Sequence, residues 1–178
     1  ITSLTARFTS TSEKYENQVL AKLNVADPEA NEFIIPVPWF YPEESTDPTS
    51  IHMTRVRLEA ELAPNCRIDP PLAMVDLTEE NYYTFTNAQG ESREIMITGK
   101  RTKSAKCNLM TFTLTKPYQI EGFIDDDKKE VYLFTTDDLT GFSAEATVCP
   151  HATLMTDLSV KKNYNEEQEV TVMAQDEK

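Results

Sequence analysis

E-L-A-P-N-C-R-I-D-P (Glu61–Pro70) and T-V-C-P-H-A-T-L-M-T (Thr147–Thr156) are the two stretches that decide the fold of this chain. They align without a gap at three apolar or proline positions: Leu62 with Val148, Pro64 with Pro150, and Ile68 with Leu154. Each stretch is followed by an Asp-Leu pair and then by a run in which polar and apolar residues alternate. Self-similarity at a fixed spacing is typical of repeated structural units. The sequence therefore predicts two copies of one β-unit.

The segments on either side extend the repeat. Residues 18–24 align with 119–125, and residues 32–38 align with 130–136. Alternation with a period of two residues indicates half-buried strands, and no segment shows a convincing helical period. Short strands separated by turns every 8–12 residues are typical of a β-sandwich. We predict an all-β chain of two tandem Ig-like β-sandwich units: residues 1–104, with a long inserted loop at 39–53, and a shorter unit at 105–178.

Local signals give more detailed expectations. The alternation over 51–62 predicts a strand, and Gly90 is expected to adopt a positive φ in a hairpin turn. Pro36 and Pro38 cannot donate hydrogen bonds to a sheet, so their strand is expected at an edge. The basic run 99–106 is interpreted as an exposed connection between the units.

Composition excludes several kinds of partner. The 178 residues carry a net charge of −13, which disfavours binding to nucleic acid or to an anionic membrane. No apolar run approaches the ~20 residues of a membrane span. The chain begins at Ile1 rather than Met, so we expect a segment upstream to have been removed.

The sequence offers little for catalysis or cofactor binding. His52 and His151 fall in different units, and no nucleophile–base pattern, phosphate loop or metal-ligand spacing is present, so we expect no enzyme activity, no cofactor and no metal. The run Asp125–Asp127 could hold a hard cation, but it is interpreted as a solvated hairpin turn balanced by lysines. The three cysteines lie far apart and are expected to be free thiols.

The inserted loop carries the candidate binding site. Trp39, Phe40 and Tyr41 are consecutive aromatics at the start of the loop and could form a stacking platform for sugar rings. Three nearby carboxylates could accept hydrogen bonds from sugar hydroxyls: Glu43, Glu44 and Asp47. The alternative is that two of the three rings close the open end of the first sandwich.

Three motifs support a resemblance to a known family. They are Y-Y-T-F-T-N-A-Q-G-E at 82–91, I-E-G-F-I-D-D-D-K-K-E-V at 120–131 and V-C-P-H-A-T-L at 148–154. The chain resembles Bacteroides-type secreted or surface lipoproteins with tandem Ig-like repeats of unknown function. The resemblance implies export, a cell-surface or outer-membrane location and an upstream lipid anchor.

Three function classes follow from these observations. The first is a non-catalytic cell-surface protein that binds a glycan or another extracellular ligand, such as a surface protein, through the first unit's loop. The second is a structural spacer or adhesin-like subunit with no small-molecule site. The third, an enzyme, is the least favoured.

The end of the chain differs between the two repeats. In the first copy the run 83–90 is followed by a return strand at 94–98, whereas the matching run 170–176 is followed only by two residues. A sandwich without its closing strand leaves backbone N–H and C=O groups unpaired. We therefore hypothesise that the edge at 169–174 supports self-association. The alternative is that the second unit simply uses one strand fewer.

Overall fold

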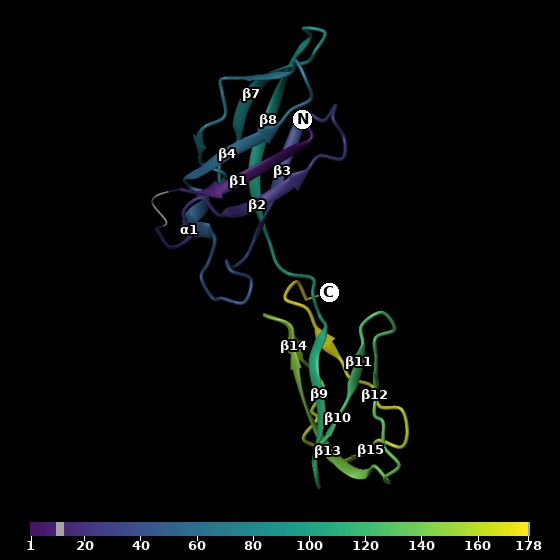
Figure 1. The fold of residues 1–178 in the computed structure, drawn as a ribbon. Coiled ribbons are helices and arrows are strands. Elements are labelled where there is room, and N and C mark those ends of the chain that lie inside the picture. Colours follow the sequence, from purple (N-terminus) through teal and green to yellow (C-terminus); the bar gives the residue numbers. More distant parts are fainter. Residues whose placement is uncertain (10–12, 178) are drawn as a thin grey trace. The chain divides into compact units, whose positions relative to one another are not determined.

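The computed structural model describes residues 1–9 and 13–177 and divides the chain into two compact units. Unit 1 comprises Ile1–Lys103 and unit 2 comprises Ser104–Lys178. Almost all regular structure in the described residues is β (Figure 1). This confirms the predicted all-β, sandwich-type fold.

Unit 1 is built from two four-stranded sheets. Its strands are β1 (Ser3–Phe8), β2 (Val19–Asn24), β3 (Glu32–Pro38), β4 (Val56–Glu61), β5 (Arg67–Asp69), β6 (Met74–Val75), β7 (Asn81–Thr86) and β8 (Ser92–Thr102). One sheet has the order β2-β1-β4-β6 and the other β3-β8-β7-β5. Helix is limited to η1 (Glu13–Tyr15) and α1 (Ser50–Met53) among these residues. The two sheets enclose a core in which Leu4, Ile35, Ile95 and Ile97 are fully buried.

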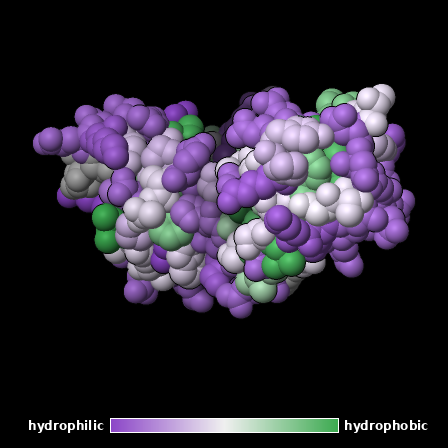
Figure 2. Space-filling view, turned by 90° about the horizontal axis from the view of Figure 1, so that it is seen from below, coloured by the Kyte–Doolittle hydropathy of each residue, from purple (hydrophilic) through white to green (hydrophobic). Residues whose placement is uncertain are grey.

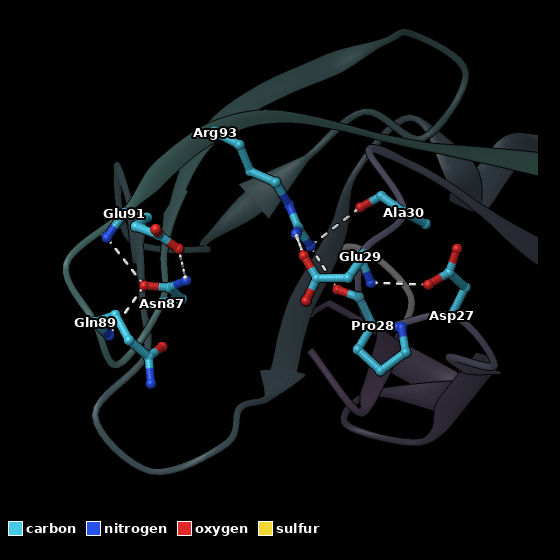
Figure 3. Close-up of polar contacts among 8 residues, drawn as sticks. All are labelled: Asp27, Pro28, Glu29, Ala30, Asn87, Gln89, Glu91 and Arg93. Carbon is cyan, nitrogen blue, oxygen red and sulfur yellow. Dashed lines mark hydrogen bonds and ion pairs between the residues drawn. The ribbon is translucent and has the colours of Figure 1, made fainter.

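The prolines and the glycine singled out in the sequence lie where they were expected, at a sheet edge and in a hairpin turn. Among the described residues, β3 lies at the end of its sheet and pairs only with β8, in parallel, which confirms the edge expected from Pro36 and Pro38. Gly90 has a φ of 84° in the turn between β7 and β8. The Asn87 side chain organises this turn, because its Oδ1 accepts from the backbone N–H groups of Gln89 and Glu91 (Figure 3).

Two expectations about unit 1 are wrong in part. The strand expected from Ile51 begins only at Val56, because α1 occupies Ser50–Met53 and turns the buried Met53 side chain into the core. The segment 99–102 is not a connection but continues β8, which stays paired with β3 as far as Thr102. Gly99 permits this continuation, since a Cβ there would lie only 2.9 Å from Leu77 Cβ.

Unit 2 repeats part of this plan, and several of its strands are shorter than their counterparts. Its strands are β9 (Leu109–Lys116), β10 (Ile120–Glu121), β11 (Phe123–Asp125), β12 (Glu130–Tyr132), β13 (Thr140–Val148), β14 (Thr153–Leu154), β15 (Lys162–Asn163) and β16 (Val172–Met173). The order β10-β9-β13-β15 reproduces β2-β1-β4-β6 of unit 1, and β14 pairs with β16 as β5 pairs with β7. The counterpart of β2 is broken at Gly122 into β10, which pairs with β9, and β11, which pairs with β12.

The cores differ in size. Among the described residues, nineteen buried apolar residues form the core cluster of unit 1, whereas six form that of unit 2: Phe112, Leu114, Leu139, Phe142, Ala144 and Leu158. Cys66, Cys107 and Cys149 are free, which confirms the expectation for the cysteines. The described part of the chain contains no helix long and apolar enough to span a membrane.

Candidate functional site

The three consecutive aromatics of unit 1 occupy three different environments. The Trp39 ring is half-buried, with the Arg101 guanidinium 3.9 Å from its centroid. Arg101 Nη2 also donates to the Trp39 carbonyl at 2.7 Å, and desolvation lowers the pKa of the arginine. One face of the indole is therefore covered by a side chain of unit 1 itself.

Tyr41 is half-buried and packs against the interior of the sandwich. Its ring lies 4.7 Å from Phe8 and 5.1 Å from Tyr15, and it packs against the core cluster. Its hydroxyl donates to Gln18 Oε1 at 3.0 Å. Phe40, also half-buried, forms an isolated β-bridge with Pro48 that closes the base of the loop. Tyr41 and Phe40 therefore stabilise the loop and the end of the sandwich.

The carboxylates of this loop also differ in their surroundings. Asp47 accepts from the Tyr15 hydroxyl at 2.8 Å and from Lys14 Nζ at 3.2 Å. These hydrogen bonds, with that from Tyr15 the larger cause, lower the pKa of Asp47. Glu43 is half-buried and Glu44 is exposed. Hydrogen bonds to Lys14 and Tyr15 thus hold the loop against the rest of unit 1. That its residues bind a ligand stays a prediction.

The histidine and acidic residues do not form a recognisable catalytic or metal centre in the described residues. His52 packs edge-on against Phe8 at 5.1 Å, and burial lowers its pKa. Asp125 forms an ion pair with Lys128 at 3.4 Å in the turn between β11 and β12. No cluster of three potential metal-ligating side chains occurs among residues 1–9 and 13–177.

A second aromatic group, not singled out from the sequence, lies on the β11–β12 hairpin of unit 2. We call it the hairpin platform and define it as Phe123, Tyr132 and Phe134. Phe123 pairs with Tyr132 across the hairpin, and the Tyr132 and Phe134 rings lie 6.2 Å apart with an interplanar angle of only 24°. Phe123 is 58% exposed and Phe134 is 78% exposed. Large apolar side chains grouped in solvent mark interaction surfaces more often than structural positions.

Strand alternation explains why these rings face outward. In the run V-Y-L-F at 131–134, Val131 and Leu133 pack against the core of unit 2, so Tyr132 and Phe134 project to the other side. The same phase holds in unit 1, where Phe33 and Ile35 are buried and Ile34 is exposed. The alternation of aromatic and aliphatic residues at 131–134 could therefore have indicated this outward pair from the sequence alone.

Charged and polar groups border the hairpin platform. The Tyr132 hydroxyl donates to Glu130, and this hydrogen bond is the largest cause that raises the pKa of Tyr132. Lys128 lies 5.6 Å from the Tyr132 ring centroid while it pairs with Asp125. The platform therefore combines flat apolar faces with hydrogen-bond donors and acceptors at its border.

Unit 2 also contains a shallow groove of about 520 Å³ over β9 and β13, with a mixed polar and apolar lining. Its lining includes the hydroxyls of Thr111, Thr113 and Thr147 and the carboxylates of Glu145 and Asp157. Part of this polarity is satisfied internally, since the hydroxyls of Thr111 and Thr147 lie 2.7 Å apart and Asp157 caps its own turn through Ser159. No aromatic ring lines the groove, which distinguishes it from the hairpin platform. Figure 2 shows a face on which small hydrophobic patches lie within a largely hydrophilic surface.

The fold and these surfaces define an all-β protein of two sandwich-type units. Residues 1–99 match the domain of unknown function DUF5018, and the chain belongs to that family. Residues 109–178 match a second domain of unknown function, DUF8499.

Other comparisons add little. No curated protein matches the sequence. A similar solved structure is that of a candidate glycoside hydrolase from Bacteroides thetaiotaomicron, at 21% identity and a TM-score of 0.31. The alignment covers 57% of this chain and 27% of that one, so the chain spans about a quarter of that protein's length. At this TM-score the likeness carries no argument about function.

Proposed function

We propose that the protein is a non-catalytic carbohydrate-binding module of two Ig-like units, and that it binds glycan through the hairpin platform. The observation that carries the proposal is the nearly parallel pair of the half-buried Tyr132 and the exposed Phe134, extended by the exposed Phe123. Export to the cell surface with an upstream lipid anchor, as the family resemblance implies, is part of the proposal.

The chemistry of a sugar fits this surface. A pyranose ring has an apolar face of C–H groups, which packs on an aromatic face and removes both from water. Its hydroxyls lie around the ring, where Glu130 can accept and Lys128 can donate hydrogen bonds. Two parallel rings 6.2 Å apart offer consecutive stacking positions for adjacent sugars of an extended chain.

The first unit's loop is the weaker site for the same ligand. Arg101 covers one face of Trp39, and Tyr41 packs inward against Phe8 and Tyr15. These contacts favour a structural role for the loop and, with it, the alternative that unit 1 acts as a spacer or adhesin-like support.

A polysaccharide array, followed by titration of the best ligand, tests the proposal. We expect Phe134→Ala to weaken binding about tenfold, which corresponds to ~1.4 kcal/mol, and the double variant Tyr132→Ala, Phe134→Ala to abolish it. Tyr82→Ala is the matched control, because Tyr82 is an exposed strand aromatic of unit 1 (55%) and should bind as the parent does. Failure of the array to find any glycan would contradict the proposal, as would a loss of binding in Trp39→Ala but not in Phe134→Ala.

A further inference from the structure

The segment that carries the hairpin platform is strongly acidic. Residues 120–138 contain seven acidic residues and two lysines, which give this segment a net charge of −5. A ligand that lies on the rings of the platform therefore meets a negative potential, and its own charge affects how tightly it binds.

The register of the hairpin places two carboxylates on the same face as the rings. Asp125 stands directly opposite Glu130, just as Phe123 stands opposite Tyr132. Residues two apart in a strand share a face and lie about 7 Å from each other along the strand. Asp125 and Glu130 therefore form the row next to the aromatic pair.

A third carboxylate lies on the other side of Phe123. A Cβ at Gly122 would lie 2.6 Å from Val131 Cγ1, so this position faces the core of unit 2. Its two neighbours, Glu121 and Phe123, therefore point outward, and both are exposed. Glu121 makes no hydrogen bond or ion pair with a described residue, so its charge is available to a ligand.

An ammonium group of unit 2 itself already occupies one of these rings. Lys128 Nζ lies 5.6 Å from the centroid of the Tyr132 ring, 3.5 Å from the Tyr132 hydroxyl and 3.4 Å from Asp125 Oδ2. An aromatic face beside a carboxylate is an environment that favours a cation. Phe123 and Glu121 repeat this combination of ring and carboxylate.

We propose, on the basis of glycan binding by the hairpin platform, that its ligands are glycans built of amino sugars with free amino groups. A sugar that stacks on the rings places its substituents at their border, where Glu121 and Glu130 attract an ammonium group. A sugar with a carboxylate or sulfate group brings like charge to the same positions, and Asp125 balances the charge of Lys128. The platform therefore excludes acidic glycans.

Three oligosaccharides of equal length and linkage test the ligand class: oligomers of glucosamine, of N-acetylglucosamine and of mannuronic acid. Calorimetric titration of the intact chain is done at pH 6, where the amino groups are largely protonated and the carboxylates are ionised. We expect the glucosamine oligomer to bind at least tenfold more tightly than its acetylated form, and the mannuronic acid oligomer not to bind. The preference should shrink between ~20 mM and ~0.5 M salt, because ions screen exposed charges.

Substitutions separate the charge from the stacking. Glu121→Gln should lower the preference for the glucosamine oligomer several-fold and leave the affinity for the acetylated oligomer unchanged, because the amide keeps the shape and removes the charge. Glu94→Gln is the matched control, since Glu94 is an exposed strand carboxylate of unit 1 and should bind as the parent does. The double variant Tyr132→Ala, Phe134→Ala should lose binding of both oligomers.

Different results overturn the ligand class and the proposed function. Equal affinity for the glucosamine and acetylated oligomers at low salt would overturn the ligand class alone, as would comparable binding of the mannuronic acid oligomer. Glucosamine binding that survives in the double variant would assign it to the net charge of the chain and overturn the role of the platform. Absence of binding of all three oligomers would overturn the ligand class together with the proposed function.

Discussion

Unit 1 and unit 2 share a strand order but differ in how completely the sandwich is closed. In unit 1 the eleven residues of β8 join two edges and bury Ile95 and Ile97 in a core cluster of nineteen residues. The described residues of unit 2 contain no counterpart of β8, and the core cluster has six members. The same apolar pattern is therefore a closed core in unit 1 and a partly exposed one in the described residues of unit 2.

The units also use their aromatic residues differently. In unit 1, Phe8, Tyr15, Tyr41 and His52 pack on one another at the end of the sandwich. In unit 2 the hairpin platform directs Phe123 and Phe134 into solvent. Unit 1 is thus organised for stability, and unit 2 presents apolar surface that a partner can cover.

The largest expected difference between the units comes from equivalent core positions. Ile35→Ala should destabilise unit 1 by ~2–5 kcal/mol, because a fully buried side chain leaves a cavity. Leu133→Ala, at the matching position, should cost unit 2 only about 1 kcal/mol, because the side chain is already half-exposed. Urea unfolding by circular dichroism measures both, and Trp39 fluorescence reports unit 1 alone since it is the only tryptophan. Equal losses in the two units would contradict the comparison.

A smaller difference is expected between an inward and an outward aromatic. Tyr41→Ala should reduce the stability of unit 1 by roughly 2–3 kcal/mol, below the full value for a large core aromatic because the ring is half-buried. Phe134→Ala should leave unit 2 within about 0.5 kcal/mol, as for surface substitutions. Thermal unfolding of both variants against the parent distinguishes the two roles. A strongly destabilised Phe134→Ala variant would show that the hairpin platform is structural.

The smallest effect concerns pH and is confined to unit 1. Burial lowers the pKa of His52 in the folded state, against an unfolded value of ~6.5. As pH falls through 6.5, the unfolded chain therefore binds the proton first, and unit 1 loses stability until the folded pKa is reached. The Trp39 transition in urea should shift modestly to lower urea between pH 7.5 and pH 5, and His52→Gln should remove that shift. A gain of stability of unit 1 on acidification between pH 7.5 and pH 5 would contradict a lowered pKa of His52.

The sequence predicted the features that local chemistry determines. The alternation of polar and apolar residues predicted most strands. Gly90 predicted the hairpin turn, and Pro36 and Pro38 predicted that β3 lies at an edge. The short helix at 50–53 and the continuation of β8 past Gly99 were missed, because both depend on contacts with residues distant in sequence. Thr49, for example, is fixed by a hydrogen bond to the Pro38 carbonyl, and Gly99 donates to the Leu77 carbonyl.

The candidate site shows the same division. Trp39–Tyr41 are three consecutive aromatic residues and are therefore easily noticed in the sequence. Adjacent residues of an extended segment, however, point to different sides. The platform residues Tyr132 and Phe134 are two apart and therefore share a side, and Phe123 joins them only through the register of β11 with β12. The spacing of Tyr132 and Phe134 could have identified this pair from the sequence. That Phe123 joins them follows only from the observed pairing of β11 with β12.

Amide hydrogen exchange on the intact chain tests the central claim most directly, by comparing β7 with β16. The amides of Tyr83 and Phe85 belong to a strand paired on both sides, by β5 and β8. Val172 lies in β16, which pairs only with β14 among the described residues, and Val170 precedes that strand. The account predicts that exchange at Val170 and Val172 is at least a hundredfold faster than at Tyr83 and Phe85, and that it is independent of protein concentration. Equal protection of the two pairs in dilute protein would show that unit 2 is already closed and would contradict the account.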